Sequence, residues 1–144
     1  MKIYFAGSIT GGRESVAQYQ AIIEVLSQYG TVLTEHVGSS SLTDRGEAAV
    51  MTSDAIYTRD IDWLRAADLL VAEVTTPSLG VGYELGFAEA NNIPTLCLFC
   101  TASGRRLSAM IAGNRSFNVV SYQDPTELVQ ILAQQIPTLV PTHA

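Results

Sequence analysis

Short apolar runs alternate with longer segments of helical spacing along most of the chain. The runs have the length of buried strands and cover residues 2–6, 31–34, 68–74, 95–99 and 117–121. Between them, apolar residues recur every three or four positions, which predicts helices over 13–29, 53–67, 82–91, 105–112 and 126–135. Strands that alternate with helices form a parallel sheet covered on both faces. We therefore expect an α/β fold.

The turn after the first run, residues 7–12, is rich in glycine. Five strands with such a turn after the first indicate the flavodoxin-like (Rossmann-like) strand order 2-1-3-4-5. Two interpretations of the turn stay open: its backbone N–H groups, with those of the helix that follows, form an anion cradle, or the turn merely reverses the chain. The turn carries neither the G-x-G-x-x-G fingerprint nor a P-loop lysine. We expect one domain over 1–144, with a frayed tail over 137–144.

Composition narrows the possible partners. The chain has 144 residues, of which 47% are hydrophobic and 15% charged, so we expect some apolar surface to be covered in an oligomer. The net charge is −6 and the eight basic residues form no run, which argues against nucleic acid as a partner. Met1 leads directly into a strand and no apolar run is long enough for a membrane span, so we expect a cytoplasmic protein.

The two cysteines, Cys97 and Cys100, lie within a strand-like apolar run. A redox pair with this spacing would open a helix instead, so buried free thiols are the better interpretation. Two histidines and no further cysteine argue against a zinc site. We expect neither a metal nor a cofactor.

Glu84 lies within residues 77–86, shortly after the predicted strand 68–74. Open α/β sheets bind ligands beyond the carboxyl ends of their strands, and Glu84 falls in the first turn of the predicted helix there. On a helical wheel it shares a face with Val81 and Phe87. Two interpretations stay open: Glu84 is a nucleophile or base, or it complements the helix dipole.

Asp60 is the second candidate acid. In the predicted helix 53–67 it falls at the centre of an apolar stripe, four residues after Ile56 and four before Leu64. A lone buried carboxylate costs several kcal/mol unless it is paired or its pKa is shifted. Either Asp60 is functional, or it pairs with Arg59 or Arg65 or caps a neighbouring helix. Two carboxylates around an anomeric carbon perform glycoside cleavage, in which one attacks and the other handles the proton.

Several polar residues complete the candidate site. Neutral hydroxyls suit a phosphate monoester in an acidic protein, and Ser78 and Ser108 could supply them. Tyr4 is either a core aromatic residue or a hydroxyl near the same strand ends. His36 follows the second predicted strand and is either a ligand contact or incidental.

These segments together resemble the 2′-deoxynucleoside 5′-phosphate N-hydrolases of the nucleoside 2-deoxyribosyltransferase superfamily. The resemblance covers roughly residues 2–122, and the matching segments are 4–9 with 11–14, 30–37, Asp60 with Trp63 and Leu64, 71–75 with 77–86, and 107–111. It implies a flavodoxin-like homodimer that cleaves the N-glycosidic bond of a nucleoside 5′-monophosphate. Glu84 matches the nucleophile that forms a glycosyl-enzyme intermediate, Asp60 the acid that assists departure of the base, and Tyr4 the residue that orients the nucleophile.

The resemblance also implies the residues that contact the substrate. Ser78 and Ser108 match phosphate contacts, with Ser108 reaching in from the partner subunit. Thr10 stands where the family often has arginine, which affects how the ligand loop meets the nucleotide. The predicted substrate-binding positions are Gly7, Ser8, Ile9, Thr10, Gly11, His36, Ser78, Gly80, Gly82, Ser108 and Met110.

Three other functions stay open. A nucleoside 2-deoxyribosyltransferase would use the same nucleophile but pass the sugar to another base. That branch carries an acid or amide near the position of Ser108, where a carboxylate would repel phosphate. A ribonucleotide N-hydrolase acting on CMP is the second alternative. A non-catalytic nucleotide-sensing domain is the third, although binding alone needs no pair of acids.

Overall fold

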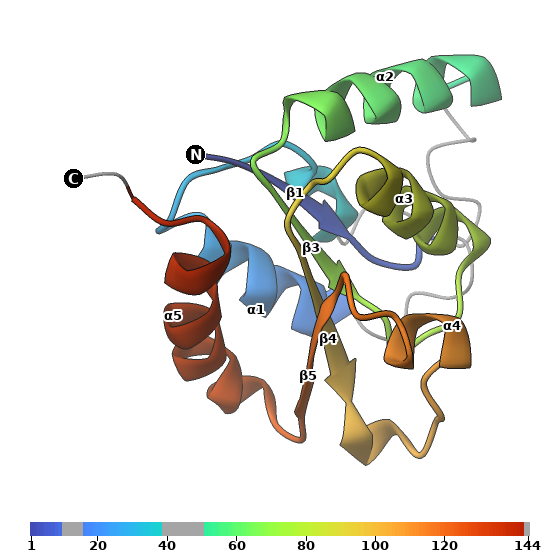
Figure 1. Ribbon diagram of the computed structural model, residues 1–144. Helices are drawn as coiled ribbons and strands as arrows, with labels where there is room; N and C mark the ends of the chain where they lie inside the picture. The colour runs from blue at the N-terminus through green and yellow to red at the C-terminus, as the bar shows by residue number, and fades with distance from the viewer. Residues whose placement is uncertain (10–15, 39–50, 143–144) are drawn as a thin grey trace.

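A five-stranded parallel sheet forms the centre of the computed structural model, which describes residues 1–9, 16–38 and 51–142 (Figure 1). Its strand order is β2-β1-β3-β4-β5, so the predicted flavodoxin-like order is confirmed. All four neighbouring pairs run parallel. The strands are β1 (Lys2–Ala6), β2 (Thr31–Val32), β3 (Leu69–Glu73), β4 (Thr95–Cys100) and β5 (Asn118–Tyr122).

Helices cover both faces of the sheet, α1 and α5 on one face and α2, α3 and α4 on the other (Figure 1). The α-helices are α1 (Val16–Leu26), α2 (Ser53–Ala66), α3 (Leu79–Ala90), α4 (Ala109–Ala112) and α5 (Leu128–Leu139). Short 3₁₀ turns connect some of them, namely η1 (Glu35–Gly38), η3 (Thr101–Ser103) and η4 (Pro125–Glu127). This layering is what a sheet with apolar side chains on both faces requires.

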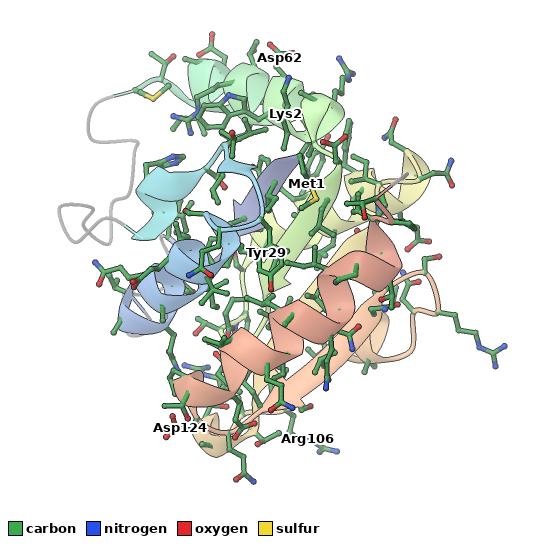
Figure 2. The ribbon with its side chains drawn as sticks, turned by 90° about the vertical axis from the view of Figure 1, so that its left-hand side faces the viewer. Met1, Lys2, Tyr29, Asp62, Arg106 and Asp124 are labelled. Carbon is green, nitrogen blue, oxygen red and sulfur yellow. The ribbon has the colours of Figure 1, made fainter. Side chains whose placement is uncertain are left out.

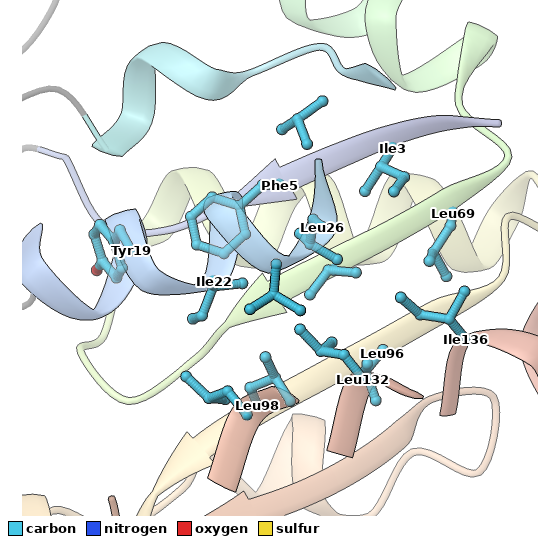
Figure 3. Packing of buried hydrophobic residues seen from close by; sticks show 14 of the residues in the cluster. Ile3, Phe5, Tyr19, Ile22, Leu26, Leu69, Leu96, Leu98, Leu132 and Ile136 are labelled. Atoms are coloured by element: carbon cyan, nitrogen blue, oxygen red, sulfur yellow. The ribbon is translucent and has the colours of Figure 1, made fainter. Parts of the chain in front are cut away.

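Successive residues of the central strands contribute to different cores. Leu69 and Val71 of β3 pack against α1 and α5, and Figure 3 shows this larger cluster from close by. Leu70 and Ala72 of the same strand pack against α2 and α3. The same alternation in β1 directs the side chain of Tyr4 to the α2/α3 face. The pleat of the sheet therefore decides which side chains reach the candidate site.

β2, α4 and α5 are among the elements that are shorter or longer than predicted. β2 ends at Val32, because the hydroxyl of Thr34 takes over the next ladder bonds: it accepts from the Phe5 N–H at 2.8 Å and donates to the Phe5 carbonyl at 2.6 Å. The helix expected over 105–112 begins only after Ser108, whose hydroxyl caps it. The helix expected to end before a frayed tail continues through Pro137 to Leu139, since a proline in the last turn removes a single N–H bond.

Candidate active site

The side chains of Asp60 and Glu84 line one cavity of about 320 Å³ between α2 and α3. The cavity is otherwise lined by Ser53, Ile56, Tyr57, Ile61, Leu64, Gly80 and Tyr83. Two acids from different helices thus face one mostly apolar space. Two-carboxylate glycoside chemistry likewise uses two acids that face one space.

Glu84 lies in the second turn of α3, and the prediction that it occupies the first turn is wrong. The helix begins at Leu79, because the Ser78 hydroxyl caps it by accepting from the Val81 N–H at 3.2 Å. The residues read as a glycine-rich turn, including Gly80 and Gly82, are therefore helical. The effect of the helix dipole falls off within the first turn. The structure thus weakens the interpretation of Glu84 as a dipole partner.

The hydroxyl of Tyr4 hydrogen-bonds the carboxylate of Glu84. The Tyr4 side chain is only 2% exposed, so its ring belongs to the core while its hydroxyl reaches the cavity acid. Burial raises the pKa of Tyr4 strongly, and the charge and hydrogen bond of Glu84 and the charge of Asp60 raise it further. The tyrosine therefore keeps its proton at neutral pH and acts as a hydrogen-bond donor.

Asp60 is not at the centre of the buried stripe, as the spacing predicted. The buried residues of α2 are Ile61 and Leu64, so the stripe is rotated by about one residue. The side chain of Asp60 is 24% exposed and pairs with Arg59, whose Nε and Nη2 donate to Oδ1 at 3.0 and 2.9 Å. The pairing that the sequence left as an alternative therefore coexists with a place in the cavity.

Arg59 also links Asp60 to His36 and Trp63, a connection that the sequence prediction missed. The guanidinium carbon lies 4.7 Å from the centroid of the Trp63 ring, and Nη2 is 3.5 Å from Nε2 of His36. The centroids of the His36 and Trp63 rings are 5.8 Å apart. An arginine four residues before a tryptophan on one helix was the available signal. His36 thus lies next to the partner of Asp60.

Ser78 and Ser108 line a second cavity of about 500 Å³, bounded by α3 and α4. Gly82 and Met110 line the same space, whereas Gly80 lines the cavity of the two acids. A Cβ added to Gly80 would lie 3.8 Å from Ser78 Oγ and 3.9 Å from Glu84 Oε1. The first turn of α3 therefore brings the Ser78 hydroxyl and the Glu84 carboxylate to the same side.

The predicted ligand loop is described as far as Ile9, and Thr10 and Gly11 lie outside the described residues. Gly7 packs against Tyr19, where a Cβ would come within 2.9 Å of the ring. The Ser8 N–H donates to the Tyr19 hydroxyl at 3.0 Å. The Ser8 hydroxyl is fully buried and has no hydrogen-bond partner among the residues that the structure describes. Such a group is costly unless a further hydrogen-bond partner satisfies it.

Glu73 is a buried acid that the sequence prediction did not single out. At the end of β3, its Oε1 accepts from the Thr75 N–H at 2.7 Å and its Oε2 from the Tyr122 hydroxyl at 2.5 Å. Burial raises the pKa of Glu73, and the hydrogen bonds from Tyr122 and Thr75 oppose that rise. An acid that directly follows four apolar strand residues was the signal.

Cys97 and Cys100 are free and buried in β4, as predicted. Burial raises the pKa of Cys97 to about 12. Among residues 1–9, 16–38 and 51–142 the His, Cys, Asp and Glu side chains form no cluster that could hold a metal ion. In the same ranges no helix combines the length and the hydropathy that crossing a membrane takes.

Comparison with known proteins places this chain in a family of enzymes that act on N-glycosidic bonds. Residues 3–129 match the model of the nucleoside 2-deoxyribosyltransferase family, and the chain belongs to that family. It is 52% identical over 142 residues to the 5-hydroxymethyl-dUMP N-hydrolase of Danio rerio, an alignment that covers 96% of this chain and 98% of the relative.

Two further relatives extend this comparison. The 5-hydroxymethyl-dUMP N-hydrolase of Homo sapiens is 52% identical over 125 residues, which cover 85% of this chain and 72% of the relative. The solved CMP N-glycosidase of Clostridium botulinum has a TM-score of 0.67 at 17% identity, covering 93% of this chain and 98% of that one, and shares the fold. The predicted family is confirmed. The prediction of an N-glycosidase is confirmed as well, because the similar relatives are named N-hydrolases of nucleoside monophosphates.

Proposed function

We propose that this chain hydrolyses the N-glycosidic bond of 2′-deoxynucleoside 5′-monophosphates and releases the free base and deoxyribose 5-phosphate. The observation that carries the proposal is the cavity lined by both Asp60 and Glu84, with the Tyr4 hydroxyl bonded to Glu84. Relatives that cover nearly the whole chain and are named as hydrolases of a deoxynucleoside monophosphate support it. Their named substrate, 5-hydroxymethyl-dUMP, is the first nucleotide to test.

Glu84 is the nucleophile in the proposed mechanism. Its carboxylate attacks the anomeric carbon, the C–N bond breaks, and the bonding electron pair leaves with the base, which Asp60 protonates. Water then attacks the same carbon, Asp60 takes a proton from that water, and the ester to Glu84 breaks. Tyr4 donates to the Glu84 carboxylate and orients it for the attack. Both acids end the cycle in the state in which they began.

Serine hydroxyls bind the 5′-phosphate in this proposal. The buried Ser8 hydroxyl lacks a partner among the described residues, and a phosphate oxygen would satisfy it. Ser78 and Ser108 accept from backbone N–H groups with their oxygens, so each hydroxyl proton stays available to a phosphate. Hydrogen bonds to a charged group contribute about 1.5–3 kcal/mol each, so two of them favour the monophosphate by about a hundredfold or more.

The chain acts as a homodimer in this proposal, with Ser108 supplied by the partner subunit. Within one chain Ser108 and Glu84 line different cavities, which supports a contribution across an interface. The side chains of Leu79 and Met110, next to the cavity of Ser108, are 96% and 82% exposed. Apolar side chains this exposed are typical of a surface that a second subunit covers.

Mixing two inactive variants tests the shared site. Glu84→Gln and Ser108→Asp are each expected to cleave monophosphates poorly, the second through repulsion between the new carboxylate and the phosphate. If Ser108 acts across the interface, a mixed dimer contains one intact site, and an equimolar mixture that exchanges subunits regains about a quarter of the wild-type rate. Ser103→Asp, at an exposed position outside both cavities, is the matched control. A mixture that stays inactive while subunits exchange would contradict the shared site.

The family model favours a second candidate, transfer of the deoxyribosyl group to another base. The two functions separate in one assay, in which chromatography follows base release from a deoxynucleoside and from its 5′-monophosphate, with and without an acceptor base. We expect the monophosphate to be cleaved with the higher kcat/KM and the acceptor base to change little. Equal rates on both substrates, or a new nucleoside formed from the acceptor, would favour the transferase. Adding CMP to the panel tests the ribonucleotide alternative, and binding without any cleavage would favour a sensing domain.

A further inference from the structure

The guanidinium of Arg59 is fixed from several sides next to the cavity of the two acids. Its Nε and Nη2 donate to Oδ1 of Asp60 at 3.0 and 2.9 Å, and its guanidinium carbon lies 4.7 Å from the Trp63 ring centroid. Its Nη1 lies 3.3 Å from the Met51 sulfur, and its Nη2 3.5 Å from Nε2 of His36. Because these contacts come from both α2 and η1, the arginine has little freedom to swing away from Asp60.

The charges around this arginine explain why its position matters. Asp60 and Glu84 line one cavity, and two carboxylates that share a site disfavour each other's ionisation. The positive charge of Arg59 offsets this repulsion. All three groups are close enough to Tyr4 to affect its pKa, which the charges of Glu84 and Asp60 raise and that of Arg59 lowers. The charged or titratable side chains near Asp60 among the described residues are Arg59 on α2, Glu84 on α3, Tyr4 on β1, His36 on η1, and the cavity residues Tyr57 and Tyr83.

We propose that Arg59 is a positioning residue for the reaction: seated on Trp63, it fixes the carboxyl group of Asp60 at the cavity and stabilises the negative charge that lies on Glu84 before the base leaves and on Asp60 afterwards. Both of the hydrogen bonds that Arg59 donates to Asp60 end on Oδ1. A guanidinium presents its donors as a rigid fork, which a lysine ammonium cannot reproduce. This inference rests on the proposed function, which assigns Asp60 its role in proton transfer.

Three variants test the role of Arg59. Arg59→Gln removes both the charge and the fork, and Arg59→Lys keeps the charge alone. Arg65→Gln is the matched control, since Arg65 lies on the same helix but its guanidinium carbon is over the Phe87 ring at 5.8 Å, whereas that of Arg59 is over Trp63 beside Asp60. The measurements are kcat and KM for a deoxynucleoside 5′-monophosphate that the wild type cleaves, the pH profile of kcat/KM, and thermal melting of each variant.

Arg59→Gln is expected to lower kcat about tenfold or more while KM changes less than about threefold. Loss of a positive charge favours the protonated form of both acids, so its pH profile should move to higher pH. Arg59→Lys should restore the profile but not kcat, and Arg65→Gln should match the wild type in both.

Two results would overturn the inference. Arg59→Gln could match Arg65→Gln in kcat and in its pH profile, which would leave Arg59 a surface ion pair. Alternatively, its whole loss could fall on KM, which would mean that Arg59 contacts the substrate itself. If Arg59→Gln fails to melt as a folded protein, Arg59→Lys decides, because wild-type kcat in that variant also overturns the inference. A wild-type protein that releases no base from any nucleotide would contradict the proposed function instead, so the two failures are distinguishable.

Discussion

Two glutamates of this chain each bond to a tyrosine hydroxyl, but on opposite faces of the sheet. On the α1/α5 face, Glu73 accepts from Tyr122 and from the Thr75 N–H, and it is 1% exposed. On the α2/α3 face, Glu84 bonds to Tyr4 and lines a cavity of about 320 Å³. The chemical pair is the same on both faces, and the space in front of the carboxylate differs.

This difference separates an acid with structural contacts from the acid for which we propose a catalytic role. Glu73 has a donor on each oxygen and is closed to solvent, so it ties the end of β3 to β5 and to the segment that leads into α3. Glu84 has one tyrosine donor and a cavity through which a substrate carbon can approach. A perturbed carboxylate is therefore evidence of function here only where a cavity accompanies it.

Replacing each glutamate by glutamine should give the largest difference between the two sites. Glu84→Gln is expected to lower kcat by about a thousandfold or more, which is about 4 kcal/mol of barrier, because an amide cannot attack the anomeric carbon. Glu73→Gln should keep kcat within about threefold and lower the free energy of unfolding by about 1–3 kcal/mol. Base release and chemical denaturation measure the two effects, with the exposed Glu24→Gln as control. A near-normal rate in Glu84→Gln would end the proposed mechanism.

Asp60→Asn extends the comparison to an acid that is partly exposed and paired. It is expected to lower kcat about a hundredfold, a typical loss when a proton-transferring group is removed. Because the pair with Arg59 is partly solvated, the free energy of unfolding should change by less than about 1 kcal/mol. Asp62→Asn is the control, since Asp62 lies on the outer side of the same helix (Figure 2). Full activity together with lower stability would mark Asp60 as structural.

The two tyrosines give a smaller contrast. Tyr4→Phe removes the donor to Glu84 and should lower kcat about tenfold, with a small change in stability because the cavity admits water to the carboxylate. Tyr122→Phe leaves an enclosed carboxylate with one donor fewer and should lower the free energy of unfolding by about 1–3 kcal/mol while kcat stays near normal. Parallel measurements of kcat and of urea denaturation check both variants. A loss of stability with normal kcat in Tyr4→Phe, together with a loss of kcat in Tyr122→Phe, would contradict the comparison.

The smallest expected effect is on the pH dependence of stability. Burial raises the folded-state pKa of Glu73 above the ordinary 4.5. The folded protein therefore binds the proton more tightly than the unfolded chain does, so this contribution is complete below about pH 4.5 and is lost as the pH rises through the folded-state pKa. Denaturation of wild type and Glu73→Gln from pH 4 to 8 should show the largest destabilisation by the variant at the acidic end. A gap that widens with rising pH would contradict this sign.

Much of the fold could be predicted from the sequence, because its signals are local. Apolar runs and helical spacing indicated the alternating strands and helices, and the glycine-rich turn after the first of five strands indicated their order, which the structure confirms. The start of α3 was misplaced because Gly80 and Gly82 have low helix propensity, and the Ser78 cap together with tertiary packing overrides that preference. The approach of Tyr122 to Glu73, 49 residues apart, depends on the registers of β3, β4 and β5 and leaves no local trace.

The candidate site also has features that the sequence predicted and features that it could not predict. Asp60 and Glu84 stood out as single residues, and the structure places them on one cavity. The rotation of α2 that moves Asp60 to the edge of its apolar stripe could not be predicted, because a helical wheel fixes relative angles within a helix and not its orientation against the sheet. The catalytic roles of both acids stay predictions that the variants above test.

The two buried thiols of β4 lie on opposite faces of the sheet, so each one can report on the helices of its own face. Cys97 packs beneath α2 and α3, and Cys100 packs beneath α1 and α5, where the Gln18 side chain of α1 contacts its sulfur. A thiol reagent reaches either sulfur only when the helices above it lift away. Labelling at Cys97 therefore times the opening of the layer that holds the candidate site, while labelling at Cys100 times the opposite layer. The rates of labelling at the two cysteines therefore report separately on the opening of the two faces of the sheet.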